Sequence, residues 1–285
     1  MVSDPERADR PHSPRRSRLT PIRRLRSLAA LALALALAFL VAQTTATSAL
    51  DPATVLAPGL SHGPIQPEKS APTAKTSKNW AGFAVTGTSF TDVTGSWVQP
   101  MVPVSGLCPA QQQDAAFWVG MDGFSSKSKT VEQIGTDSDC NKASKKGPGV
   151  PHYYAWWQIA PQPSVNLATS CPTCQVSPGD SMTAQVSANG SSYTLTLRDN
   201  SVPWTFSTTQ TSAAAQASSV EWITEDPLKA PGSSVGKLAD FGSVTFSGLT
   251  ISGIHFSGMV QITMKNRASA TLQSTSSFRV DWLHN

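Results

Sequence analysis

The chain has 285 residues and carries 22 Lys and Arg against 18 Asp and Glu, a formal net charge of +4. The basic excess lies at the N-terminus, where residues 1–27 hold eight Arg and three acids. Removing residues 1–49 takes those charges away and leaves 14 bases and 15 acids, a net charge of −1. This balance argues against a basic nucleic-acid-binding surface, and we expect no nucleic-acid partner.

The first segment, residues 1–49, has the order of a secretory signal peptide. Its basic part precedes an apolar run at residues 28–42, and small residues follow, with cleavage expected near Ala46 or Ala49. The run is short and Ala-rich, whereas a membrane-spanning helix needs about 20 apolar residues. We therefore expect a secreted, extracellular protein without a membrane partner after signal cleavage. Pairs of Arg leave the general secretory and twin-arginine routes both open.

Residues 50–78 form a second segment, rich in Pro, Ala, Ser, Thr and Lys and without apolar periodicity. This composition is typical of a linker or a pro-segment. The texture changes at Asn79, and residues 79–285 are long enough for one sizeable domain.

All four cysteines lie in the part expected to be exported, which favours disulfides. Three pairings are open, and we favour Cys108–Cys140, around the segment that holds Gln133, and the local pair Cys171–Cys174. A redox Cys-x-x-Cys needs a strand-then-helix context, and a zinc site needs paired ligand spacings. Neither pattern occurs, and we expect no metal and no cofactor.

Short alternating segments dominate the domain. Apolar residues alternate with polar ones at 182–186 and again at 193–197, with Asn189-Gly190 between them, which predicts a β-hairpin. The same period recurs at 244–246, 262–264 and 278–282, and the only helix-like stretch is residues 213–217. The pattern predicts an all-β fold, an antiparallel sandwich of two sheets.

Two strand-like apolar segments contain polar residues that are candidates for chemistry. Residues 131–137 include Gln133, and residues 220–226 include Glu221. Partial burial of a carboxyl raises its pKa and suits it to proton transfer. Period two places Gln133 on one face with Asp137, and Glu221 on one face with Glu225. By itself, this pattern favours Glu221 as a strand residue that points outward or pairs with a Lys over a catalytic role.

The order of several motifs resembles the glutamic peptidase (eqolisin) family, and we expect a secreted bacterial member. They include Asn-Trp-Ala-Gly, Phe-Trp-Val-Gly-Met-Asp-Gly, Glu-Gln-Ile-Gly-Thr-Asp and Glu-Trp-Ile-Thr-Glu-Asp. The matching segments in chain order are residues 79–82, 93–100, 117–123, 132–137, 154–158, 176–180, 220–226 and 239–246. Residues 251–285 match only loosely, and we expect them to form closing strands.

The resemblance implies a concanavalin/lectin-like sandwich and a secreted endopeptidase that acts on proteins or peptides at acidic pH. The family's catalytic residues fall on Gln133 and Glu221. Its cleft positions, expected to bind substrate, fall on Trp80, Trp118, Asp122 and Asp137. Fungal members have acids where this chain has Tyr154 and Gln158, so its pH dependence is expected to differ. We also expect a monomer.

Other functions stay open at this point. The eight Trp would suit a carbohydrate-binding sandwich that has no need of Glu221. A glycoside hydrolase would need a second carboxyl about 5–9 Å from Glu221, supplied by Glu225 or Asp122. A family member that has lost its activity is a third alternative.

Overall fold

The computed structural model describes residues 60–66, 74–104, 106–125, 128–142, 147–230, 233–254 and 258–284. The predicted signal peptide and much of the predicted linker lie outside these residues. The described residues all belong to one compact unit, Leu56–Asn285. Within them, helices fall short of the length and apolar character needed to cross a membrane.

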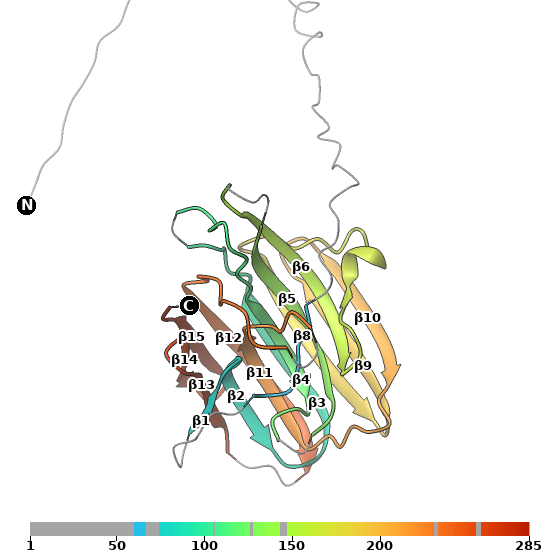
Figure 1. The fold of residues 1–285 in the computed structure, drawn as a ribbon. Coiled ribbons are helices and arrows are strands. Elements are labelled where there is room, and N and C mark those ends of the chain that lie inside the picture. The colour runs from blue at the N-terminus through green and yellow to red at the C-terminus, as the bar shows by residue number, and fades with distance from the viewer. Residues whose placement is uncertain are drawn as a thin grey trace, which may run out of the picture. The chain divides into compact units, whose positions relative to one another are not determined.

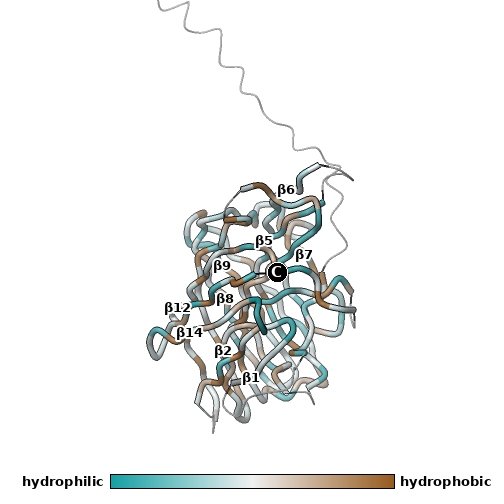
Figure 2. Tube along the Cα trace, turned by 60° about the vertical axis from the view of Figure 1, so that its left-hand side comes forward, coloured by the Kyte–Doolittle hydropathy of each residue, from teal (hydrophilic) through white to brown (hydrophobic). Residues whose placement is uncertain are grey.

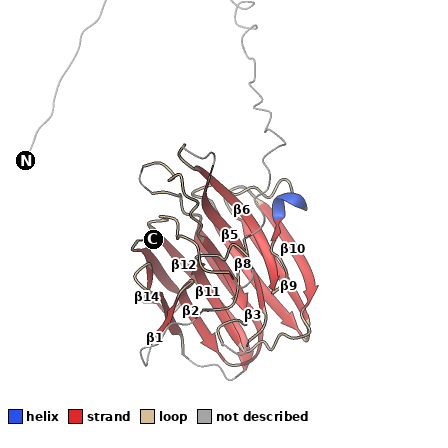
Figure 3. Cartoon of the chain, in the orientation of Figure 1, coloured by secondary structure: helices blue, strands red, loops and turns tan. Residues whose placement is uncertain are grey.

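Strands make up nearly all the regular structure in the described residues, with a single short 3₁₀ helix (Figure 3). The elements are β1 (Ala74–Ser77), β2 (Trp80–Thr86), β3 (Thr88–Val98), β4 (Ala116–Met121), β5 (Val131–Asn141), β6 (Val150–Ala160), β7 (Val165–Asn166), η1 (Leu167–Thr169), β8 (Ser181–Asn189), β9 (Ser192–Asp199), β10 (Trp204–Thr211), β11 (Ser219–Glu225), β12 (Ser243–Ile254), β13 (Val260–Met264), β14 (Ala268–Ser274) and β15 (Ser277–Trp282).

The predicted all-β, antiparallel architecture is confirmed, but the strands are joined differently from the expected two separate sheets. Hydrogen bonds link them in one continuous order, β10-β9-β8-β3-β12-β15-β14-β13-β2-β11-β4-β5-β6-β7. The exception to antiparallel pairing is β1, which runs parallel to β13. The sheet curls so that β4 and β5 pack against β8 and β9, as the layers of a sandwich do (Figure 1).

The main core fills the space between these facing strands. Strands β8 and β9 bury every second residue, as the alternating pattern predicts, and hydrophobic and hydrophilic residues interleave along the trace (Figure 2). The buried side chains that face one another across this core include Val93, Trp97, Phe117, Val119, Ile134, Ala184, Leu195 and Trp222. Strands β4, β5 and β11 are buried on both faces. One face packs into the main core, and the opposite face carries the polar candidates.

Local predictions can be compared with the strands directly. The hairpin between β8 and β9 is confirmed, with Asn189 opposite Ser192 and a positive φ of 60° at Gly190. The helix expected at residues 213–217 is wrong, because this stretch is a loop. Its amides at Gln216 and Ala217 donate to the Asp122 carboxylate at 2.8 and 2.9 Å, which replaces helical hydrogen bonding.

The sheet also begins earlier than residue 79. Strand β1 pairs residues Ala74–Ser77 with β13, so the end of the predicted linker belongs to the fold. Strand β1 is short, and of its residues Lys75 and Thr76 are only partly buried, whereas Ser77 is buried. A short edge strand of this kind has no need of alternating apolar residues.

Candidate active site

Neighbouring strands place Glu221 and Gln133 in one row across the sheet. Glu221 on β11 lies between Ala84 on β2 and Gly120 on β4, and Gly120 lies opposite Gln133 on β5. The row ends at Gln158 on β6. Two strand spacings of about 4.8 Å place the Cα atoms of Glu221 and Gln133 roughly 10 Å apart, with both side chains on one face. We call the face that carries this row the polar wall.

The residue between the two candidates is a glycine. A Cβ atom added to Gly120 would lie 3.1 Å from the Cβ of Gln133 and 2.8 Å from the ring of Trp118. A glycine suits this position because the Trp118 ring and the Gln133 side chain pack closely over its Cα. The glycine thereby lets Trp118 and the amide of Gln133 lie side by side next to Glu221.

Glu221 is fully buried, and in the described part of the chain neither carboxyl oxygen has a hydrogen-bond partner. Burial raises its pKa well above the usual range, and the nearby carboxyls of Asp122 and Glu132 raise it further. The Ser219 side chain and the Phe124 backbone lie close enough to oppose this rise, without hydrogen-bond geometry to Glu221. An unpartnered buried carboxyl costs free energy unless another group binds it, as expected of a functional group.

Gln133 is also buried, and its side-chain amide already binds a peptide carbonyl. Its Nε2 donates to the backbone oxygen of His62 at 2.6 Å. The amide stays neutral at every pH, so it remains a hydrogen-bond donor where carboxylates are protonated.

A row of acids lies on the same face, separated from the first row by Ile223, Trp118 and Gly135. Glu225 and Asp137 flank Ala116 of β4, just as Glu221 and Gln133 flank a glycine. Trp118 Nε1 donates to Glu225 at 2.9 Å, and Tyr154 donates to Asp137 at 2.7 Å. Burial raises the pKa of Asp137 to about 8 and that of Glu225 well above its usual range.

Three of the four predicted substrate-binding residues lie on the polar wall. Trp80 and Trp118 pack edge to face with ring centroids 5.0 Å apart, and Asp137 lies in the row of acids. Asp122 differs, because it follows β4 with a positive φ of 66° and accepts hydrogen bonds from the 216–218 loop, including Ser218. Asp122 therefore lies beyond the end of β4 and holds the 216–218 loop in place. Its charge contributes to the raised pKa of Glu221.

Sequence reasoning missed several members of the wall. Trp156 donates through Nε1 to Asp137 at 2.7 Å, and Gln158 lies opposite Gln133. Tyr154 and Gln158 are the two positions where the resemblance expects acids. Tyr154 donates to Asp137, and Gln158 donates to the Gln162 carbonyl at 2.6 Å, which a carboxylate in either position could not do.

A segment far away in the chain covers the wall. Residues 60–66, which we call the strap, bury Leu60, His62 and Ile65 against it. The His62 ring stacks on Trp156 with centroids 3.5 Å apart and planes 3° from parallel. Burial lowers the pKa of His62 well below its usual value. No sequence signal marked this segment beyond its place before the domain.

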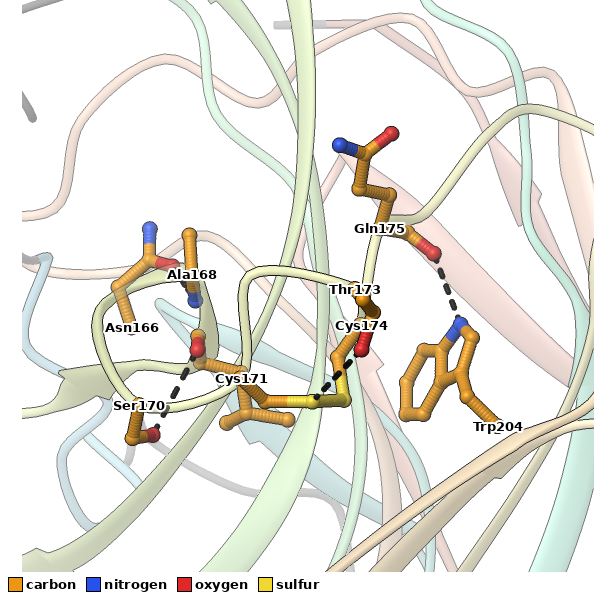
Figure 4. Close-up of a disulfide and its surroundings, with 9 residues drawn as sticks. Asn166, Ala168, Ser170, Cys171, Thr173, Cys174, Gln175 and Trp204 are labelled. Carbon is orange, nitrogen blue, oxygen red and sulfur yellow. Dashed lines mark hydrogen bonds between the residues drawn. A yellow bond between two sulfur atoms is a disulfide. The ribbon is translucent and has the colours of Figure 1, made fainter.

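The disulfides are the two pairs favoured from the sequence, Cys108–Cys140 and Cys171–Cys174. Cys140 lies on β5, the strand that carries Gln133. Figure 4 shows the second bridge beside the 3₁₀ helix, near the hydrogen bond from Trp204 to the Gln175 backbone. Among the described residues, no three His, Cys, Asp or Glu side chains are placed to hold a metal ion.

The sequence also contains a motif of the kind that carries a nucleophilic serine in some hydrolases. Residues 232–236, Gly-Ser-Ser-Val-Gly, fit the pattern Gly-x-Ser-x-Gly, whose serine acts at a strand-to-helix turn. Ser234 lies in the connection from β11 to β12, and the next described element is a strand. The motif therefore lacks the context that its chemistry requires.

Known proteins share this fold and sequence pattern. Residues 78–282 match the model of the Peptidase A4 family. Aspergillopepsin-2 of Aspergillus niger is 30% identical over 191 residues, which are 60% of this chain and 63% of that protein, so the chain spans less than two thirds of that relative.

Solved structures agree on the fold. A crystal structure of Scytalido-glutamic peptidase with a peptide based transition state analog has a TM-score of 0.56 at 19% identity, covering 72% of this chain and 98% of that chain. SCP-B, a member of the eqolisin family solved with the tripeptide Ala-Ile-His, has a TM-score of 0.53 at 19% identity and the same coverage. Since the family match spans most of its length, this chain belongs to the Peptidase A4 family.

Proposed function

We propose that this protein is a secreted endopeptidase that hydrolyses proteins or peptides with Glu221, Gln133 and an activated water. The observation that carries the proposal is the row in which Gly120 separates these two buried side chains. The hydrogen bond from the Gln133 amide to a backbone carbonyl supports a role as donor to a substrate carbonyl. Membership of a peptidase family supports peptide bonds as the target.

In the reaction, Glu221 takes a proton from water while the water oxygen attacks the scissile carbonyl carbon. Gln133 donates a hydrogen bond to the oxygen on which negative charge develops. Glu221 then returns the proton to the nitrogen of the leaving amine, and the C–N bond breaks. General acid–base catalysis supplies about 10²–10⁴-fold and an oxyanion donor about 10²–10³-fold. The rest must come from positioning of an extended substrate along the wall.

The charge states of the acids on the wall favour activity at acidic pH. Glu221 must be ionised to act as a base, and burial is the largest cause of its raised pKa. Water that enters an open cleft reduces this effect and brings the pKa of Glu221 back toward its usual acidic range. Burial also raises the pKa of Asp137, to about 8, and that of Glu225, so in the closed wall both acids are neutral at acidic pH.

The rival functions fit the wall less well. Of the two acids expected for glycoside hydrolysis, Glu225 lies four residues from Glu221 along β11, about 13 Å between Cα atoms at the usual strand rise. The other, Asp122, is held by four hydrogen bonds from the 216–218 loop. A carbohydrate-binding module would present its Trp side chains to solvent, whereas Trp80 and Trp118 are fully buried. The monomeric state and the bacterial origin stay predictions. Two disulfides support export to an oxidising compartment.

The test compares wild type with Glu221→Gln and Gln133→Ala on a denatured protein substrate in acidic buffer. We expect kcat/KM to fall by about 10²–10⁴-fold for the first variant and about 10²–10³-fold for the second. Asp92→Asn is the control, because Asp92 lies on β3, outside the wall, and its carboxyl accepts hydrogen bonds from Gln185 and Ser187. Wild-type turnover by Glu221→Gln, with the same thermal melting as the control, would refute the assignment.

A further inference from the structure

A buried carboxyl lies on the core side of β5, directly beside the proposed catalytic row. Glu132 precedes Gln133 in the strand, so its side chain points to the opposite face, where it is fully buried. It lies opposite Met121 of β4, which lies opposite Val220 of β11. Burying a carboxyl costs free energy that an apolar side chain would not cost. A functional role would offset this cost, and the proposed reaction has so far given Glu132 none.

Glu132 holds the start of the loop that leads into β11, residues 212–218, which we call the lead-in loop. The hydroxyl of Ser212, its first residue, donates to the Glu132 carboxyl at 2.7 Å. At the other end of the loop, the amides of residues 216–218 donate to Asp122 at 2.8, 2.9 and 2.9 Å. Two buried carboxyls, one after β4 and one on β5, therefore fasten the loop at both ends.

The end of the lead-in loop is joined to the strand of Glu221. Ser219 begins β11, its carbonyl accepts from the Asp122 amide at 3.0 Å, and Glu221 follows two residues later. Backbone hydrogen bonds to Ser191, Gly87 and Phe90 complete the hold on the loop. A shift of the loop would therefore move the beginning of β11.

One side of the lead-in loop borders open space. Its residues 215–217 line a cavity of about 240 Å³, together with Phe90, Tyr193 and other residues at the β8–β9 turn. Close packing normally holds a loop in place, and here it is absent on this side. The hydrogen bonds of the loop to Glu132 and Asp122 consequently matter more for its position.

We propose that Glu132 is a positioning residue for the proposed reaction: through the lead-in loop, its neutral carboxyl keeps Glu221 in the row with Gln133. The inference rests on the proposed function of Glu221 and Gln133. Glu132 lies on the strand of Gln133, and the loop runs into the strand of Glu221. The hydrogen bond from Ser212 therefore ties the two proposed catalytic strands together.

The charge of Glu132 decides whether it can hold the loop. The titratable groups that face it are Asp122, Tyr193 and Glu221. Burial raises the pKa of Glu132 to about 8, the Ser212 hydroxyl opposes this rise, and the Asp122 carboxyl adds to it. Burial also raises the pKa of Tyr193, whose phenol stays neutral. Glu132 is therefore neutral in acid, and above about 8 it becomes a carboxylate that Asp122 repels.

The test measures kcat and KM separately on a denatured protein substrate in acidic buffer. In Glu132→Leu, the leucine fills the buried space but cannot accept from Ser212. We expect kcat to fall by about 10²-fold, the loss that a shift of about 1 Å between reacting groups causes. KM should stay unchanged, because Glu132 points away from the wall. Glu132→Gln should recover most of the loss, since its amide oxygen accepts from Ser212 as a neutral carboxyl does.

Ser212→Ala tests the same contact from the loop, and Asp92→Asn is the control. Ser212→Ala should lower kcat as Glu132→Leu does, and the double variant should lose no more than either single variant. Hydrogen exchange gives a readout that needs no activity. The amides of residues 216–218 should lose protection in Ser212→Ala and keep it in Asp92→Asn, with the amides of β8 and β9 as the internal reference. In wild type they should lose it as pH rises toward 8, and in Glu132→Gln they should keep it.

Each contrary result has a distinct meaning. Wild-type kcat in a folded Glu132→Leu, an equal loss in Glu132→Gln, or a change confined to KM overturns the inference and leaves the proposed function standing. A fall in activity that only follows the folded fraction in thermal melting overturns it too, because that is a purely structural effect. If Glu132→Leu does not fold, Ser212→Ala decides by the same criteria. Wild-type turnover in Glu221→Gln overturns the proposed function itself.

Discussion

Gly120→Ala is the most direct test of the space between Glu221 and Gln133. The new methyl group would lie 3.1 Å from the Cβ of Gln133 and 2.8 Å from the ring of Trp118, closer than ordinary van der Waals contact. The neighbours must shift, which costs typically about 1–3 kcal/mol of stability for overpacking. The shift also displaces the side chain of Gln133, which we propose as the donor to the substrate carbonyl.

A misplacement of about 1 Å between reacting groups costs about 10²-fold in rate. We therefore expect kcat/KM on a denatured protein substrate to fall by about 10²-fold in Gly120→Ala. The assay uses acid-incubated protein, with the folded fraction measured by thermal melting.

Gly95→Ala is the matched control. A Cβ at Gly95 would lie 2.6 Å from the ring of Trp222, in the main core on the far side of β11. It should lower the melting temperature and leave kcat/KM per folded molecule unchanged. Equal losses of kcat/KM in both variants, or full activity in Gly120→Ala, would refute the geometric reasoning.

Two further predictions concern stability. The folded-state pKa of Asp137, about 8, lies above its ordinary value of 3.8, so its contribution is present below that ordinary value and lost as pH rises toward 8. The melting temperature should therefore fall between these pH values, with a shallower fall in Asp137→Asn; equal slopes would contradict the shift. Replacing Cys108 and Cys140 by Ser should lower the free energy of unfolding by about 3–4 kcal/mol, since the bridge spans 32 residues. The bridge Cys171–Cys174 spans 3 residues, and its loss should cost about half as much in the same denaturant titration.

The strand faces could be predicted from the sequence, because alternation is a local property of a strand. Gln133 and Asp137 share a face, as do Glu221 and Glu225, as period two requires. The loop at residues 213–217 could not be predicted, because helix propensity there is outweighed by three amides and a hydroxyl that bind the distant Asp122.

The pairing of the strands that form the wall could not be predicted from the sequence either. Gln158 meets Gln133 only through the register of β5 with β6, which local composition does not encode. The joining of all the strands in one curled sheet likewise follows from pairings such as β13 with β2, between segments far apart in the chain.

The sequence by itself determined the strand class, the cysteine pairs that we favoured, and the two residues that we propose as catalytic. Only the tertiary structure decided what lies between and above them. Gly120 becomes meaningful once β4 separates β11 from β5. His62 reaches Gln133 and Gln158 across separations of 71 and 96 residues. Such contacts depend on how the sheet curls, whereas a sequence pattern records only the neighbours of each residue along the chain.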